Sequence, residues 1–150
     1  MGLTLNSPAF REGETIPQQF TCDGQDISPE LRWSAVPHNT RSFALIMDDP
    51  DAPSGTFTHW ILFNLPSAIQ TLPEEGSSLG TIGKNDFGKV AYGGPCPPQG
   101  DQAHRYYFTL YALDIPTLNL EEGTTRGNVE AAMQGHIIGK ALLMGRYARG

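Results

Sequence analysis

The sequence predicts a mainly β protein, a β-sandwich with small helical additions, for three reasons. Short runs of apolar, branched and aromatic residues stand between long, turn-rich connections, which is typical of strands in a sandwich. The chain contains 17 glycines and 12 prolines, and this content disfavours long helices. Only one helical pattern occurs, late in the chain. With 150 residues, the simplest organisation is a single domain, residues 1–150, around one core.

The first third of the chain contains two short strands separated by turns. Leu3-Thr4-Leu5 alternates weakly and suggests an opening strand. Residues 21–24 read Thr-Cys-Asp-Gly, which is a turn signal, and residues 28–33 lead into a second strand. A loop over residues 37–40 follows, in which His38 is expected to be solvated.

Two central strands come next. Ser42 to Met47 is a nearly continuous apolar run, too short for a helix and bounded by turn residues, so we expect a strand that is buried on both faces. Thr58 to Leu65 is rich in aromatic and branched residues, stops at Pro66, and predicts a second central strand. The core is expected to include Trp33, Trp60 and Phe63.

The second half of the chain adds a long excursion, two strands and the helix. Residues 67–91 are polar and glycine-rich and predict an excursion without a second domain. Tyr106 to Leu113 predicts a third central strand, and Ala141 to Tyr147 a last one. Between them, apolar residues at spacings of three to four predict one helix face: Val129, Ala132, Met133 and Ile137.

The ends of this helix and its histidine can also be predicted. Thr124 or Thr125 would cap the start, because a side-chain oxygen there can accept from the first free backbone N–H groups. Gly139 would end the helix. His136 lies on or near the apolar face and is expected to be a core histidine with a satisfied hydrogen bond.

Composition excludes several classes of partner. The formal net charge is −6 and the acidic residues are scattered over the whole chain, so nucleic acid and anionic membrane surfaces are poor global partners. A small anion in a locally positive pocket remains compatible with this charge. No apolar run approaches the roughly 18 to 20 residues that cross a bilayer, so no membrane insertion is expected. Residues 1–10 lack the basic and apolar regions of a secretory signal, and we expect a cytoplasmic location.

An acidic loop between the two central strands is the first candidate site. Residues 48–53 read Asp-Asp-Pro-Asp-Ala-Pro, and His59 follows on the next strand. Prolines fix φ and keep the preceding residue away from helix, so the loop is stiff, as the support of a site should be. Asp49, Asp51, Pro53 and His59 are therefore candidate site residues. The alternative is a structural network, in which a loop carboxylate satisfies a buried His59 and fastens two strands.

A second loop carries complementary groups. Residues 93–100 read Gly-Gly-Pro-Cys-Pro-Pro-Gln-Gly and precede His104-Arg105-Tyr106. Glycines expose backbone N–H groups and prolines freeze the shape, so the loop can form an anion-binding concavity. His104 and Tyr106 point to the same side if the strand has already begun. The amides free to donate would be those of Gly93, Gly94, Cys96, Gln99 and Gly100.

The two cysteines, Cys22 and Cys96, are too few for a disulfide framework. Two interpretations remain open. Cys96 could be a reactive thiol between two prolines, or Cys22 and Cys96 could form one bridge that pins the second loop in an oxidising setting.

Together the two loops resemble those of a known family. Asp49-Pro50-Asp51-Ala52-Pro53 followed by His59, and Gly94-Pro95-Cys96-Pro97-Pro98 followed by Gly100 and His104-Arg105-Tyr106, are similar to the motifs of the phosphatidylethanolamine-binding protein family. This family includes the Raf-kinase-inhibitor-like proteins. The similarity covers nearly the whole chain and is greatest to the compact prokaryotic branch. Counterparts also exist for Thr21 to Gly24, Ser28-Pro29 and Gly135-His136.

The resemblance implies a Greek-key β-sandwich with a small pocket for phosphate-like and carboxylate-like anions, and no required metal or cofactor. His59 or His104, held protonated by Asp49 or Asp51, would supply positive charge. By position, the pocket-lining groups are Asp49, His59, His104 and Tyr106; the backbone wall is Gly94, Cys96 and Pro97; the supporting residues are Asp51, Pro53 and Arg105.

Two functions are compatible with these residues. The first is a binding module that captures a small anion (phosphate, carboxylate or a phospho-head-group) without turning it over, because every candidate group is a donor or an orienter and no activated nucleophile is evident. A kinase or protease could be its protein partner, as the family name suggests. The sequence is also compatible with a homodimer. The alternative is a hydrolase or metal-assisted enzyme that uses Asp49, His59 and His104.

Overall fold

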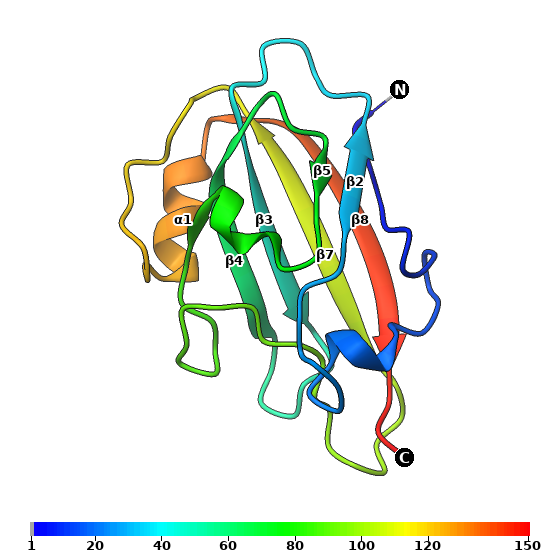
Figure 1. Cartoon of the computed structure of the whole chain (residues 1–150). Coiled ribbons are helices and arrows are strands. Elements are labelled where there is room, and N and C mark those ends of the chain that lie inside the picture. Colours follow the sequence, from blue (N-terminus) through cyan, green and yellow to red (C-terminus); the bar gives the residue numbers. More distant parts are fainter. Residues whose placement is uncertain (1) are drawn as a thin grey trace.

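The computed structural model describes residues 2–150, and its strands form two antiparallel sheets beside one α-helix (Figure 1). The smaller sheet has the order β1-β2-β5, with β1 at Thr4–Asn6, β2 at Leu31–Ser34 and β5 at Thr71–Leu72. The larger sheet has the order β6-β4-β3-β7-β8. Its strands are β3 (Ser42–Asp49), β4 (Phe57–Pro66), β6 (Thr81–Ile82), β7 (His104–Leu113) and β8 (Ile137–Tyr147).

The predicted fold class is confirmed. The helix α1 spans Arg126–Met133, and two short 3₁₀ turns, η1 (Gln18–Phe20) and η2 (Gly76–Leu79), complete the chain. In the larger sheet β3 lies between β4 and β7, although a long connection separates β4 from β7 in the sequence. After this long connection β7 pairs with β3 and not with β4, the long strand before it, which is the mark of Greek-key connectivity.

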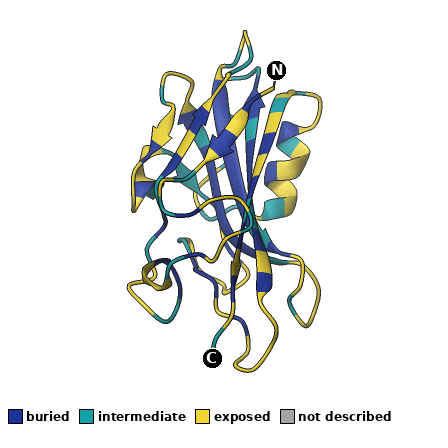
Figure 2. Cartoon of the chain, turned by 90° about the vertical axis from the view of Figure 1, so that its right-hand side faces the viewer, coloured by how far each residue is buried: buried dark blue, intermediate teal, exposed yellow. Residues whose placement is uncertain are grey.

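The strand β3 is buried on both faces, as its continuous apolar run predicts. Phe43, Leu45 and Met47 face the smaller sheet and form the main core with residues from both sheets. Ala44 and Ile46 face the other way and pack with the residues of α1 in a second cluster. Figure 2 shows this burial along the central strands, whereas the loops at the strand ends are largely exposed. Trp33, Trp60 and Phe63 are buried as expected.

The helix begins and ends at identifiable residues. The Thr125 side chain accepts a hydrogen bond from the Asn128 amide and caps the start, which confirms one of the two predicted caps. The predicted end is wrong, because Gly135, at φ +85°, provides the left-handed residue that stops the helix. Ile137 therefore begins β8 with an exposed side chain, and Gly139 lies inside that strand.

Other boundaries also differ from the sequence prediction. The excursion over residues 67–91 contains β5, η2 and β6, which are too short to leave a clear pattern. His38 is exposed, as predicted. His136 is not a core residue, since its side chain is 42% exposed and its Nδ1 lies 2.9 Å from Asp114 Oδ1. Within residues 2–150, no helix has the length and apolar character needed to cross a membrane.

Candidate functional site

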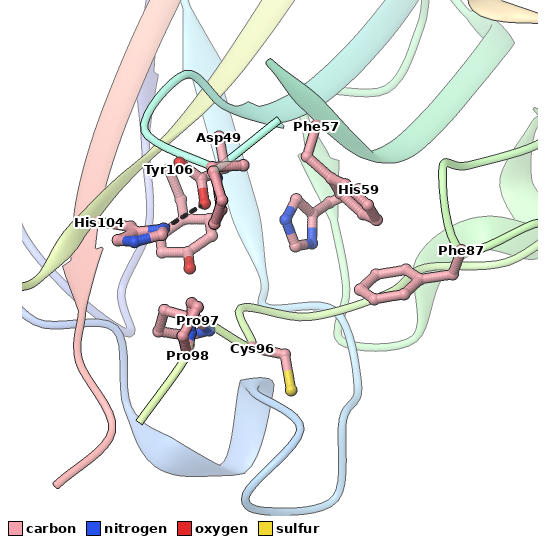
Figure 3. A pocket seen from close by; sticks show the side chains of 11 residues that line it. Asp49, Phe57, His59, Phe87, Cys96, Pro97, Pro98, His104 and Tyr106 are labelled. Carbon is pink, nitrogen blue, oxygen red and sulfur yellow. Dashed lines mark hydrogen bonds and ion pairs between the residues drawn. The ribbon is translucent and has the colours of Figure 1, made fainter. Parts of the chain in front are cut away.

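The acidic loop and the proline-rich loop meet around one cavity of about 180 Å³ (Figure 3). The cavity lies where β3 ends and where β4 and β7 begin, because antiparallel pairing brings these three strand ends together. The predicted meeting of the two loops is therefore observed. Its lining consists of Asp49, Ala52, Pro53, Phe57, His59, Phe87, Cys96, Pro97, Pro98, His104 and Tyr106.

Strand alternation brings three of the polar groups into this cavity. β7 has already begun at His104, so His104 and Tyr106 share its inner face with Phe108, as the spacing predicts. Asp49 is the last residue of β3 and is only 3% exposed. Regular pleating of two neighbouring strands is sufficient to position these side chains.

His59 reaches the cavity through a break in this regularity. Met47 pairs with Trp60 and Asp48 pairs with Thr58, so His59 is the extra residue of a β-bulge in β4. A bulge redirects side chains near its position. Thr58 consequently contacts Arg126 on the helix side at 3.0 Å, while His59 and Trp60 both face the inner side despite being adjacent in sequence.

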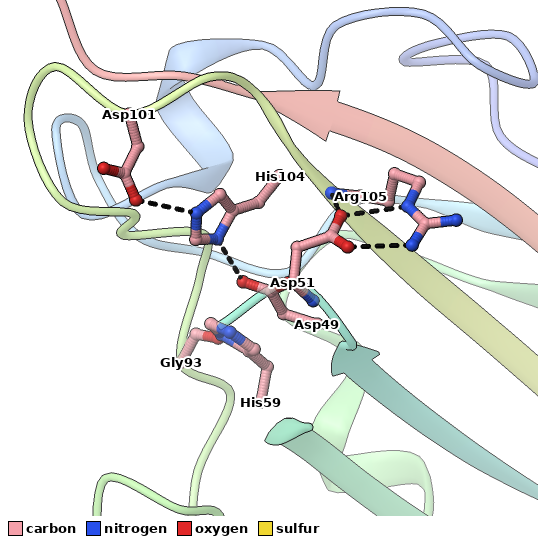
Figure 4. Close-up of polar contacts among 7 residues, drawn as sticks. All are labelled: Asp49, Asp51, His59, Gly93, Asp101, His104 and Arg105. Atoms are coloured by element: carbon pink, nitrogen blue, oxygen red, sulfur yellow. Dashed lines mark hydrogen bonds and ion pairs between the residues drawn. The ribbon is translucent and has the colours of Figure 1, made fainter. Parts of the chain in front are cut away.

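His104 is held between two carboxylates (Figure 4). Its Nδ1 lies 2.7 Å from Asp49 Oδ2 and its Nε2 lies 3.2 Å from Asp101 Oδ2. Burial alone would lower the pKa of His104, but the hydrogen bonds to the two carboxylates outweigh it and raise the pKa above its usual value. Of the two histidines, His104 is therefore the one whose protonated form is favoured by carboxylates. Asp101 is a partner that the sequence reasoning did not find.

His59 has the opposite protonation preference. Its Nδ1–H donates to the carbonyl of Gly93 over 2.7 Å, and burial lowers the pKa of the ring. The other ring nitrogen, Nε2, is directed toward Asp49 and Tyr106 (Figure 3). The expectation that a carboxylate pairs with His59 is not met, because Asp49 is already engaged by His104 and by the Asp51 amide, which donates to Oδ1 at 2.7 Å.

Tyr106 lies between the two histidines. Its ring meets His59 edge-on at 5.3 Å between centroids and lies nearly parallel to His104 at 6.5 Å. Burial and the negative charge of Asp49 raise the pKa of the phenol. The hydroxyl is fully buried and has no hydrogen-bond partner within residues 2–150. A buried hydroxyl that lacks a partner and borders a cavity is a candidate for a hydrogen bond to a bound ligand atom.

Asp51 and Arg105 support the pocket from outside. Both Asp51 oxygens accept from the Arg105 side chain at 2.8 and 2.9 Å, and Oδ2 also accepts from the Arg105 amide at 2.9 Å. These bonds lower the pKa of Asp51 to about 2. Asp51 therefore fastens the acidic loop to β7 and does not charge a histidine.

The glycines of the second loop serve the chain's own packing. The Gly94 amide donates to Asp26 Oδ1 at 2.8 Å, and a Cβ on Gly94 would collide with the Phe20 carbonyl. Gly94 therefore does not line the cavity, although it was predicted as part of the wall. The amides of Gly93 and Gly100 are likewise bonded, to the carbonyls of His59 and Arg149. Cys96 and Pro97 do line the cavity, as predicted.

A disulfide joins Cys22 to Cys96, with the two Cα atoms 5.4 Å apart. The Cys22 amide also donates to the Pro95 carbonyl at 3.1 Å, so this turn and the second loop are tied twice. Of the two interpretations for these cysteines, the bridge is the observed one. A reactive Cys96 thiol is therefore wrong for this structure.

Two aromatic walls escaped the sequence reasoning. Phe57 opens β4 and Phe87 lies in the turn after β6, and their rings contact each other at 4.7 Å. Phe87 also meets the His59 ring edge-on at 5.4 Å. The only available signal was an aromatic residue inside a polar turn, Asn85 to Gly88.

The comparisons with known proteins agree with this architecture. Residues 6–148 match the family model described as phosphatidylethanolamine-binding protein. The chain belongs to the phosphatidylethanolamine-binding protein family. Relatives of this chain include a UPF0098 protein of Aquifex aeolicus, 49% identical over 95% of this chain and 86% of the relative. A UPF0098 protein of Methanothermobacter thermautotrophicus is 47% identical over 99% of this chain and all of the relative.

Solved structures of phosphatidylethanolamine-binding proteins have the same fold. A putative homologue of the family from Chlamydia trachomatis, CT736, superposes with a TM-score of 0.93 at 42% identity, covering 99% of both chains. YBCL of E. coli, described as a new member of the mammalian family, also gives 0.93, at 30% identity over the full length of both chains. A carboxypeptidase Y inhibitor solved with its cognate proteinase shares the fold alone, with a TM-score of 0.64 at 18% identity over 99% of this chain and 84% of the inhibitor.

Proposed function

We propose that this pocket binds one small anion, phosphate-like or carboxylate-like, or the phospho-head-group of a larger molecule. The observation that carries the proposal is the buried Tyr106 hydroxyl, which has no partner among the described residues and borders the cavity. Leaving a buried donor unpaired costs roughly 1–3 kcal/mol, and an anionic oxygen in the cavity would remove that cost.

The shape and charge of the pocket support the same guest. A cavity of about 180 Å³ accepts only a few non-hydrogen atoms, or one end of a larger molecule. Its walls include Phe57, Phe87 and Pro97, which exclude water and so strengthen electrostatic interactions inside. His104 lies at the polar side, where the carboxylates of Asp49 and Asp101 favour the protonated form of its ring.

We further propose that the guest is bound without being turned over. Cys96 is in a disulfide, and both ring nitrogens of His104 are engaged by carboxylates, so neither is placed as a nucleophile or a free base. Among residues 2–150, no three His, Cys, Asp or Glu side chains are grouped to hold a metal, which leaves the metal-assisted alternative without support. Regulation of a kinase or protease would need an anionic group on that partner to enter the same pocket.

Thermal unfolding with phosphate and with acetate tests the proposal. Millimolar anion should raise the unfolding temperature of the unmodified protein and of Tyr107→Phe, because Tyr107 lies on the outer face of β7 and does not line the cavity. In Tyr106→Phe the protection should be much smaller. Equal protection of the two variants, or no protection of the unmodified protein, would contradict anion binding at this pocket.

A further inference from the structure

Few polar groups of the pocket remain open for a guest. Asp49 accepts hydrogen bonds at both oxygens, and His104 is bonded at both ring nitrogens. The amides of Gly93 and Gly94 are used by the chain itself. Within residues 2–150, the groups left at the cavity are one donor, the Tyr106 hydroxyl, and one ring nitrogen, His59 Nε2.

His59 Nε2 is an acceptor and not a donor. The hydrogen bond from Nδ1–H to the Gly93 carbonyl fixes the tautomer, so Nε2 carries a lone pair when the ring is neutral. Burial among Phe57, Phe87 and Tyr106 opposes protonation of this ring. The pocket therefore meets a guest with one donor, the Tyr106 hydroxyl, and one acceptor, His59 Nε2.

The charged and titratable groups around this ring come from three elements. β3 contributes Asp49, and β7 contributes His104 and Tyr106. The second loop contributes the Gly93 and Gly94 carbonyls, with the Asp26 carboxylate behind them. Asp49 and Asp101 balance the positive charge that His104 carries when protonated. This charge therefore does little to reduce the repulsion between the lone pair of His59 Nε2 and a lone pair of the guest.

An anion without a proton would place an oxygen lone pair against the lone pair of Nε2. We propose that His59 selects for anions that carry a proton. This inference rests on the anion-binding function proposed above. Anions that keep a proton near neutral pH, such as monohydrogen phosphate, bind as they are. Fully deprotonated anions, such as sulfate, bind only together with one proton taken from solvent.

The proton balance differs between these two guests. With monohydrogen phosphate, the guest O–H donates to His59 Nε2 while another oxygen accepts from Tyr106, and no covalent bond needs to break. With sulfate, one proton from the buffer adds to Nε2 and converts the imidazole to imidazolium, which then donates to a sulfate oxygen. The complex with sulfate thus contains one proton more than its separated components.

Calorimetric titration of the whole protein in two buffers of different ionisation enthalpy measures this proton directly. At about pH 8, sulfate should bind with uptake of about one proton and phosphate with none, since the ring is neutral and only phosphate supplies a proton. Between about pH 7.5 and 8.5 the affinity for sulfate should fall about tenfold, whereas that for phosphate should change less than about twofold.

The outcomes separate this inference from the function beneath it. If neither anion binds, the proposed function itself fails. If both bind without proton uptake and with equal pH dependence, anion binding stands and selection by His59 is wrong. These measurements use the unmodified protein and so do not depend on a variant that folds.

A variant gives a second readout. In His59→Gln an amide that donates without titrating replaces the ring, so sulfate binding should lose its pH dependence and its proton uptake. His38→Gln is the matched control, because His38 is an exposed loop histidine and should leave both unchanged. Proton uptake that persists in a folded His59→Gln variant would assign the proton to another group and overturn the inference.

Discussion

At the scale of single residues, the two pocket histidines differ because of the partners that their ring nitrogens find. His104 is bonded to two carboxylates and is favoured as a cation, whereas His59 donates to a backbone carbonyl and is favoured as a neutral ring. Tyr106 stands between them, and its hydroxyl has no hydrogen-bond partner among residues 2–150. One residue type therefore supplies, within a single cavity, a ring that favours the cationic form and a neutral ring that offers an acceptor.

Removal of the outer carboxylate should change the titration of His104. The pKa of His104 is raised in the folded protein, so its ion pairs stabilise the fold fully below the unfolded pKa of 6.5 and lose that effect as pH rises through the folded pKa. In Asp101→Asn the pKa of His104 should fall toward 6.5, measured by NMR titration. The stability difference from the unmodified protein should be below about 1 kcal/mol, since Asp101 is exposed, and should shrink above about pH 6.5.

Asp114→Asn is the control for this titration, because Asp114 pairs with His136 away from the cavity. It should leave the pKa of His104 unchanged. A stability difference for Asp101→Asn that grows with rising pH would have the wrong sign for the ion pair.

Tyr106→Phe should not weaken the fold. The substitution removes a buried hydroxyl that makes no hydrogen bond within the described chain, so the free energy of unfolding should stay level or rise by up to about 1 kcal/mol. Chemical denaturation measures this in anion-free buffer. A loss of more than about 1 kcal/mol would mean that the hydroxyl has a partner in solution.

At the scale of elements, the site depends on close contacts between loops and on one irregular strand. The bulge in β4 turns His59 inward, and the segment around η1 supports the second loop through Gly94, Asp26 and the Phe20 carbonyl. The walls of the cavity are therefore held by backbone packing on both sides. Small changes in these contacts should be felt in binding as well as in stability.

Gly94→Ala should test this packing. The new Cβ would meet backbone atoms of Phe20 and Thr21, which cannot move aside as a flexible side chain can, so the variant should lose roughly 1–3 kcal/mol of stability and much of its phosphate affinity. Denaturant unfolding and phosphate titration measure the two effects.

Gly127→Ala is the opposite case and serves as its control. Gly127 is exposed in the first turn of α1, where a Cβ would meet only Thr125 Oγ1 at 4.0 Å, an ordinary contact, so the substitution should add roughly 0.5–1 kcal/mol and leave binding unchanged. Full stability and unchanged affinity in Gly94→Ala would show that the loop tolerates a shift.

Much of this element structure could be predicted from sequence, and the failures have physical causes. The apolar run of β3 and the shared face of His104 and Tyr106 follow from local periodicity. The bulge at His59 does not, because residues 58–65 read as an uninterrupted strand and the skipped pairing depends on β3. The helix end was misread because Ile137 continues the helical spacing by chance after Gly135.

The pocket, too, could be predicted only in part from the sequence. The loop motifs indicated its position and several of its polar groups, whereas the pairing of His104 with Asp101 and the wall formed by Phe87 depend on how the loops fold back. Glycines predicted to approach a ligand proved to approach the chain's own backbone. A glycine in the sequence indicates that another group approaches the backbone closely. It does not show whether that group is a ligand or another part of the chain.

At the scale of the whole molecule, the disulfide links a turn after η1 to the wall of the pocket across 74 residues. Such bridges persist in oxidising compartments and in the intracellular proteins of some hyperthermophiles, and are rare in other cytosolic proteins. The cytoplasmic location stays a prediction, and the bridge adds a condition on the redox state of that compartment.

Reduction of the bridge should lower stability substantially. Opening a closed loop of this length releases chain entropy worth about 4 kcal/mol in the unfolded state, which corresponds to a fall of roughly 10 °C in the unfolding temperature. Phosphate affinity should also fall, because Cys96 lines the cavity. The double variant Cys22→Ser with Cys96→Ser should behave like the reduced protein and ignore added reductant, and an unchanged unfolding temperature in both would mean that the bridge does not form in solution.

The bridge also divides the polypeptide into a covalent ring, residues 22–96, and two tails. Asp49 and His59 belong to the ring, whereas His104 and Tyr106 belong to the carboxyl-terminal tail. Residues 51–56, which include the end of the acidic loop and the turn after it, are mostly exposed and lie inside the ring. Cleavage of one peptide bond there would release no fragment, because the disulfide would still join the two pieces. The cleaved molecule would keep its whole binding site in one covalent unit until a reductant opened the bridge.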